Sequence, residues 1–293
     1  MLAYLVFFLT VAAILSIATL GLNLQWGVNG QFNAGVVGFV AVGAYALAIL
    51  TMKSGLPFAV ALAASLAISA AVALLVGLAT LRLRSDYLAI ATFGVATSIQ
   101  VLANNLEGLT GGSRGLVGIP RPFEGFGQDV FSVLYLMMVF GLVGLIYIGL
   151  QTLLRSPWGR VLRAIREDEV ASASLGKNVV RFRLAAFVLG AMLMGLCGAL
   201  YAGYVGAISP AEFLPIMTFQ VWAMLIVGGS GSNRGAIVGS FAIWGLWTFS
   251  GAAIVSALPL GAQSHGGAIQ AILVGLILVV TLLVRPHGIM GAR

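Results

Sequence analysis

Apolar stretches of about 20 residues, separated by short polar ones, follow one another along almost the whole chain. A helix of that length crosses the ~30 Å hydrocarbon core of a bilayer. The pattern therefore predicts an all-α, polytopic integral membrane protein in a single transmembrane domain, residues 1–293. We expect about nine transmembrane helices, within a range of about eight to ten. The apolar stretches lie near residues 2–21, 33–52, 57–80, 86–104, 130–153, 184–207, 215–229, 235–256 and 266–284.

The composition agrees with this pattern. Hydrophobic residues make up 60% of the chain and charged residues 8%, whereas about a quarter of the residues in a soluble globular protein are charged. The net charge of +7 does not indicate a nucleic-acid partner, because basic residues concentrate in the cytoplasmic loops of membrane proteins. The single cysteine, Cys197, allows neither a disulfide nor a cysteine metal cluster within one chain. We therefore expect no metal site and no cofactor.

A polar segment at residues 22–33, LNLQWGVNGQFN, interrupts the apolar pattern near the start of the chain. It is rich in amide side chains and glycine. Irregular backbone at membrane depth must be surrounded by protein or by a water-filled cavity. Two interpretations stay open, a plain polar loop or a broken or re-entrant helix that lines a pathway. In the second, the candidate substrate-path residues are Gln25, Asn29, Gln31 and Asn33.

A charged segment at residues 155–183 lies between two of the long apolar stretches. It reads RSPWGRVLRAIREDEVASASLGKNVVRFR and holds seven of the fifteen Lys/Arg and three of the eight Asp/Glu residues. Its basic excess predicts a cytoplasmic location. With nine spans, Arg82, Arg84 and Arg234 then fall on the cytoplasmic side as well, and the loop at residues 105–129 falls outside.

The pattern within residues 155–183 predicts one or two short amphipathic helices. Arg163 and Glu167 are four residues apart and can pair on a helix surface, and Gly176 suits a helix C-terminus. A basic amphipathic helix can bind anionic lipid head groups, but the acidic triplet at residues 167–169 favours a protein partner. The candidate docking residues are Arg160, Arg163, Ile165, Arg166, Glu167, Asp168, Glu169 and Gly176.

No motif of covalent catalysis stands out. The glycine-rich GGSGSNRG at residues 228–235 lacks the Gly-Lys-Ser/Thr ending of a phosphate-binding loop and indicates a tight turn. His265 and His287 lie in short loops with no carboxylate near them in the sequence. We therefore predict no catalytic residues and a chain that is not an enzyme.

Ion-driven carriers place ionisable residues inside their helices, and the apolar stretches here almost lack them. If the chain moves a solute uphill, we expect the energy to come from another protein. A stand-alone secondary carrier or channel is kept as the alternative.

Small residues recur at four-residue spacing on two of the predicted helices. Such stripes let neighbouring helices approach closely. Packing within this chain is the favoured interpretation, and contact with a partner permease is the alternative. The stripe residues are Ala191, Gly195, Ala199 and Gly203 on one helix and Gly235 and Gly239 on the other.

Motifs along nearly the whole chain resemble the permease subunits of ABC importers for branched-chain amino acids, within the ABC permease family of LivH/LivM proteins, and in particular the LivM type. The longest is SPWGRVLRAIREDEVASASLGKNVVRFRLAAFVLGAMLMGLCGALYA at residues 156–202. The others are GLNLQWGVNGQFNAGVVGFVAVGAYALA (21–48), LRSDYLAIATFG (83–94), LTGGSRGLVGIP (109–120), ISP (208–210), VGGSGSNRGAIVGS (227–240) and VRPHGIMG (284–291).

The resemblance implies a multi-pass subunit of the bacterial inner membrane that carries no ATPase of its own. Its implied partners are a second, LivH-like permease subunit, two cytoplasmic ATP-binding subunits and a periplasmic substrate-binding protein. Residues 160–176 are then the segment that docks on the ATPase. The glycine of this loop falls seven residues after Glu169, whereas the EAA loop of ABC permeases has it after six.

The resemblance also implies the substrate class, branched-chain or other small apolar amino acids carried across the inner membrane. The segment at residues 22–33 departs from the usual family pattern, because it contains more amides. An importer of the same class for urea or short amides is therefore an alternative.

Overall fold

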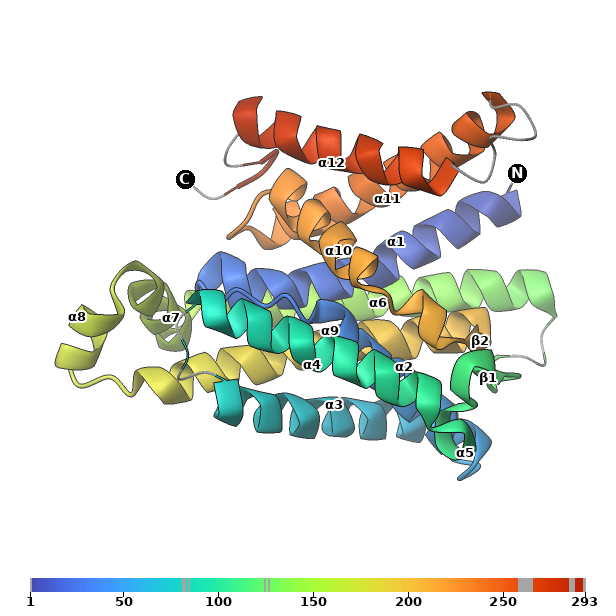
Figure 1. Cartoon of the computed structure of the whole chain (residues 1–293), viewed down its shortest axis with the longest axis horizontal. Coiled ribbons are helices and arrows are strands. Elements are labelled where there is room, and N and C mark those ends of the chain that lie inside the picture. Colours follow the sequence, from blue (N-terminus) through green and yellow to red (C-terminus); the bar gives the residue numbers. More distant parts are fainter. Residues whose placement is uncertain are drawn as a thin grey trace.

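The computed structural model describes residues 2–80, 83, 85–123, 125, 127–257, 266–284 and 288–291 (Figure 1). Most of the long helices run along the long axis of the molecule. They are α1 (Leu2–Leu22), α2 (Val36–Met52), α3 (Phe58–Thr80), α4 (Ser85–Asn105), α6 (Gln128–Arg155), α9 (Val179–Val205), α10 (Pro215–Gly228), α11 (Asn233–Ala257) and α12 (Gly266–Val284).

The short elements connect these helices. One of them is a π-helical turn, η1 (Asn23–Val28), that directly continues α1. The others are α5 (Glu107–Thr110), η2 (Gly112–Arg114), β1 (Leu116–Val117), α7 (Pro157–Glu167), α8 (Glu169–Ser174), β2 (Ala207–Ile208) and η4 (Pro210–Glu212).

Each of the nine predicted apolar stretches overlaps one of the long helices. Six segments within the described residues are long and apolar enough to cross a membrane, and α2 and part of α12 are shorter apolar helices. The prediction of an all-α, multi-pass membrane protein is confirmed, apart from one ladder of two-residue strands. The number of nine spans stays a prediction. The six segments are Ala3–Val28, Phe58–Thr80, Asp86–Asn105, Val130–Arg155, Val179–Val205 and Pro210–Gly228.

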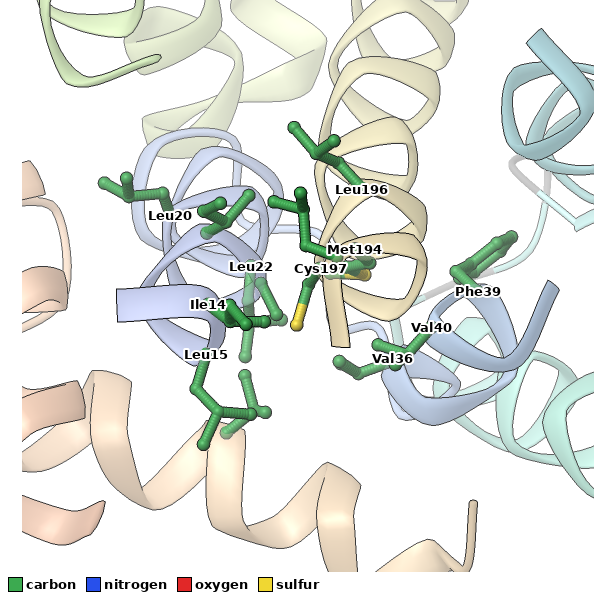
Figure 2. Close-up of a cluster of buried hydrophobic side chains, with 14 of the residues drawn as sticks. Ile14, Leu15, Leu20, Leu22, Val36, Phe39, Val40, Met194, Leu196 and Cys197 are labelled. Atoms are coloured by element: carbon green, nitrogen blue, oxygen red, sulfur yellow. The ribbon is translucent and has the colours of Figure 1, made fainter. Parts of the chain in front are cut away.

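Helices α1, α2 and α9 form the centre of the bundle. Their apolar side chains interlock, with Ile14 and Leu22 from α1, Phe39 and Val40 from α2, and Cys197 from α9 (Figure 2). Cys197 is fully buried and projects between α1 and α2. It is therefore a small packing residue in the described structure.

The small-residue stripes lie where helices of this same chain approach closely. A Cβ atom on Gly43 of α2 would lie 1.9 Å from the carbonyl oxygen of Gly195 on α9. A Cβ atom on Gly239 of α11 would likewise lie 1.9 Å from the carbonyl oxygen of Met224 on α10. Ala191 and Ala199 are fully buried. These contacts bring the helix backbones together without a side chain between them.

The bundle has two distinct ends (Figure 1). At the first, called the α7 end, lie α7, α8 and the turn before α11. At the second, called the β1–β2 end, β1 pairs with β2 in an antiparallel ladder in which Leu116 faces Ile208. Four residues named in the sequence analysis, Arg82, Arg84, His265 and His287, lie outside the described residues.

Candidate functional site

Helix α1 does not simply end but passes into the π-helical turn η1 at the α7 end of the bundle. Gly27 makes this geometry possible, because a Cβ atom there would lie 2.1 Å from Oδ1 of Asn23 and 2.6 Å from the amide nitrogen of Gly231. Gly30 follows with a φ of +71°, which glycine adopts at little cost. Residues 23–28 therefore continue α1 as a π-helix, and irregular backbone follows to residue 35; the two parts together are called the broken helix below. That this segment lines a pathway stays a prediction.

The amides of the broken helix point into the protein rather than into solvent. Asn23, Gln25, Gln31 and Asn33 are fully buried and Asn29 is 3% exposed. The Asn23 side chain clamps the turn before α11. Its Nδ2 donates to Oδ1 of Asn233 at 2.9 Å, and its Oδ1 accepts from the amide of Gly231 at 2.8 Å.

Gln25 and Asn33 form a second set of hydrogen bonds, which joins the segment to α9 and α10. Nε2 of Gln25 donates to the carbonyl oxygen of Phe187 on α9 at 2.8 Å, and Nδ2 of Asn33 donates to Oε1 of Gln25 at 2.8 Å. Oδ1 of Asn33 accepts from the amide of Gly35, and its carbonyl accepts from Nε1 of Trp222 at 3.0 Å. These two candidate path residues therefore hold the segment in place.

Asn29 and Gln31 differ from the other amides, because no group within the described part of the chain hydrogen-bonds to either polar atom of either side chain. A buried amide without a partner costs about 1–3 kcal/mol of stability. Groups of this kind call for a physical explanation, such as a bound water, an ion or a functional role. They are the two residues of the predicted path whose hydrogen-bonding capacity is still free.

The charged segment at residues 155–183 folds into α7 and α8, which confirms the prediction of one or two short helices. Pro157 occupies the first turn of α7, where a missing N–H costs nothing. Oδ1 of Asp168 caps α8 by accepting from the amide of Ala171 at 2.9 Å. Gly176, with a φ of +75°, lies between the end of α8 and the start of α9.

Helix α7 turns its apolar side chains toward the bundle. Leu162 is fully buried and Ile165 is 5% exposed. Ile165, a candidate docking residue, therefore anchors α7 on this chain, and a partner protein cannot reach it. The side chains that stand out from the surface are the acidic triplet at residues 167–169 together with Val170 and Leu175, 77% and 80% exposed.

Arg163 and Glu167, whose spacing allows them to pair, form no ion pair among the described residues. Nη2 of Arg163 donates to the carbonyl oxygen of Leu154 at 3.0 Å, and the ion pair found within the described residues joins Arg183 to Glu169 at 2.9 Å. The last carbonyls of a helix have no partner within the helix. A cation that hydrogen-bonds to one of these carbonyls stabilises the end of α6. An exposed ion pair contributes less than ~1 kcal/mol and does not outweigh this bond.

Arg166 joins the two parts of the site. Its Nη1 donates to the carbonyl oxygen of Gly27 in η1. Its Cγ lies 3.2 Å from the position that a Cβ atom on Gly30 would occupy. Helix α7 is thereby in direct contact with the broken helix.

Asn233 and Trp222 also support this site, although the sequence pattern does not predict them there. Asn23 and Asn233 are 210 residues apart, and the sequence around Asn233 indicates only a tight turn. No local pattern signals such a contact.

The chain matches the family described as "Branched-chain amino acid transport system / permease component" over residues 4–282. It is similar to the high-affinity branched-chain amino acid transport system permease protein LivM of Salmonella typhimurium, with 37% identity over 78% of this chain and 59% of that relative. Against LivM of Escherichia coli the identity is 33%, over 96% of this chain and 68% of the relative.

The high-affinity branched-chain amino acid transport system permease protein LivH of Salmonella typhimurium is 28% identical, over 67% of this chain and 62% of the relative. The chain thus spans 59% and 68% of the lengths of the two LivM proteins. No solved structure matches it.

Replacing Arg166 with Ala should loosen the broken helix. The change removes a charged hydrogen bond to Gly27, and such a bond contributes about 1.5–3 kcal/mol. Backbone amides at residues 27–31 should then exchange hydrogen at least about tenfold faster, as measured by mass spectrometry of the purified chain. Arg160→Ala is the control, because Arg160 reaches only the carbonyl of Arg155. Equal exchange in both variants would rule out the link.

Proposed function

Because the chain belongs to the branched-chain amino acid transport permease family, we propose that it is the membrane-spanning permease subunit of an ABC importer. The proposed substrates are branched-chain or other small apolar amino acids. The observation that carries the proposal is the contact between α7, with its exposed acidic end, and the broken helix η1. It offers a path by which an external protein can act on the membrane-embedded part.

We place the protein in the bacterial inner membrane, with the α7 end in the cytoplasm and residues 105–129 outside. The basic excess of residues 155–183 supports this orientation. The similarity to both LivM and LivH proteins supports pairing with a second, related permease chain. Two ATP-binding subunits and a periplasmic substrate-binding protein complete the proposed assembly.

The proposed docking surface for the ATPase consists of Glu167, Val170 and Leu175. These side chains are exposed, and Val170 and Leu175 are large apolar groups on an otherwise polar element. Asp168 and Glu169 lie between them but also serve the chain itself, as the cap of α8 and as the partner of Arg183. Glu167 is free of such a role among the described contacts.

In the proposed mechanism, closure of the ATPases moves α7 and α8 as a unit. Arg166 passes this displacement to η1 through the carbonyl of Gly27. The helix ladder is already interrupted there, so the backbone can change shape without breaking a regular helix. Asn29 and Gln31 then present their free amide groups to the passing polar end of the substrate.

Reconstitution into liposomes tests the proposed class. We expect leucine uptake only when the chain is combined with its permease partner, its ATPases, the binding protein and ATP. The chain alone should give none, because the described spans provide almost no ionisable groups for ion coupling. Uptake by the chain alone would instead support a stand-alone carrier or channel. ATP-dependent uptake of urea in place of leucine would support the amide-transporting alternative.

Replacing Glu167 with Lys should weaken coupling to the ATPase. The variant reverses an exposed charge that supports no other part of the chain. We expect about a tenfold loss of transport-linked ATP hydrolysis in the assembled importer, from a loss of about 1.4 kcal/mol at the interface. The matched control is Glu107→Lys at the β1–β2 end. Equal losses in the two variants, or none in Glu167→Lys, would contradict the docking assignment.

Replacing Asn29 with Leu and Gln31 with Met separates a transport role from a structural one. Both changes remove unpartnered buried amides, so the isolated chain should gain about 1 kcal/mol or more in stability toward thermal unfolding. Uptake by the assembled importer should nevertheless fall. Gln25→Met is the control and should lower stability, because Gln25 bonds both Phe187 and Asn33. Unchanged uptake by the double variant would remove these residues from the path.

A further inference from the structure

A cavity of about 370 Å³ opens at the α7 end of the bundle, between the end of α6, α7 and the turn before α11. Three arginines line it, Arg155 from α6, Arg163 from α7 and Arg234 from α11, and Tyr147 and Asn233 form part of its wall. The cavity has no part in the proposed substrate path, and nothing in the family match explains it.

Among the described residues, no carboxylate lines the cavity to balance its positive charge. None of its lining residues is acidic, and the ion pair found within the described residues, Arg183 with Glu169, lies elsewhere. Arg163 bonds a backbone carbonyl, and Nε of Arg234 donates to the hydroxyl of Tyr147 at 3.1 Å. Each guanidinium has five N–H donors, so most donors remain free. Guanidinium groups with free donors are suited to bind phosphate.

The depth of the cavity matches that of lipid head groups. Arg155 is the last residue of α6, which has 28 residues, and Asn233 is the first of α11, which has 25. Helices of these lengths exceed the ~30 Å of the hydrocarbon core, so their ends lie at its boundary. The three guanidinium groups are therefore held where the phosphates of one leaflet lie.

Exposed apolar side chains on α6, called the apolar track, lie further from the α7 end than Arg155, toward the membrane interior. Leu145 and Ile148 on α6 are 69% and 65% exposed. They lie ten and seven residues before Arg155, which places all three on one face of the helix. An acyl chain can follow this face while the head group stays at the arginines.

We propose that this cavity binds the phosphate of one anionic phospholipid. The guanidinium groups of Arg155 and Arg234 hold the phosphate oxygens, and one acyl chain lies along Leu145 and Ile148. The shared chemistry, a phosphate held by arginines, would also suit a free phosphate ion. The apolar track favours the lipid, and the experiment separates the two sources.

The test uses the purified full-length chain in phosphatidylcholine nanodiscs, with and without a fraction of phosphatidylglycerol. Lipid retained on the protein is counted by native mass spectrometry, and thermal unfolding is followed in parallel. We expect one tightly retained phosphatidylglycerol on the wild type. The variant Arg155→Gln/Arg234→Gln should bind it on the order of tenfold more weakly, since each basic residue at the surface contributes to anionic lipid binding.

Arg181→Gln is the matched control, an exposed arginine of the same end that does not line the cavity, and it should retain the lipid. In phosphatidylcholine alone all proteins should unfold at the same temperature. If the double variant is unstable there, Arg155→Gln alone replaces it, because Arg155 makes no side-chain bond within the described residues.

Equal retention by the variant and the wild type would overturn the proposal. So would equal stabilisation by inorganic phosphate in phosphatidylcholine nanodiscs, which would assign the cavity to a free ion. These measurements require neither substrate nor partner subunits. They therefore stand or fall independently of the proposed function.

Discussion

Backbone that leaves helical geometry inside a membrane protein must find its hydrogen bonds within the protein, because lipid offers none. This constraint governs the segment between α1 and α2. Its amides and carbonyls, and the first turn of α2, bond to side chains from three other elements, α4, α7 and α10. The amide of Ala34 donates to Thr92 of α4 at 3.0 Å, and the amide of Val37 donates to Thr218 of α10 at 3.1 Å. Trp222 and Arg166 satisfy two carbonyls.

The break in α1 therefore fixes the positions of its neighbours. Helices α4, α7, α10 and the turn before α11 each contribute a group without which part of the segment would be left unpaired. An unpaired buried backbone group costs about as much as a lost hydrogen bond, or about 1–3 kcal/mol. A movement of any of these elements changes the stability of the break. This is the physical basis for the mechanism proposed above.

The sequence predicted the long helices and the charged segment well, because both follow from hydrophobicity and length. The family resemblance rested on several motifs together, and the family match confirms it. Small-residue stripes, such as the one that contains Gly195, also predicted where helices lie close together, since only small residues allow close helix contact. A broken helix at residues 22–33 could be considered because glycines and amides cluster there.

The sequence could not predict the hydrogen-bond partners of the polar side chains. Arg163 reaches the end of the preceding helix instead of Glu167, since the unpaired carbonyl of Leu154 is the better acceptor. Five amides looked alike in the sequence, yet Asn23, Gln25 and Asn33 are fully engaged and the other two are free. That difference depends on partners such as Phe187, 162 residues away from Gln25. It emerges only from the packed structure.

Asn233 connects the broken helix to the basic cavity at the α7 end. Its Oδ1 accepts from Asn23 of the broken helix, and its Nδ2 donates to Oε1 of Gln151, which lines the basic cavity, at 3.3 Å. Arg163 lines the same cavity and holds α7 to α6. A phosphate bound there would neutralise the repulsion among the arginines and keep α6, α7 and the turn before α11 together. A movement of α7 would then shift η1, because α7 could not separate from α6 instead.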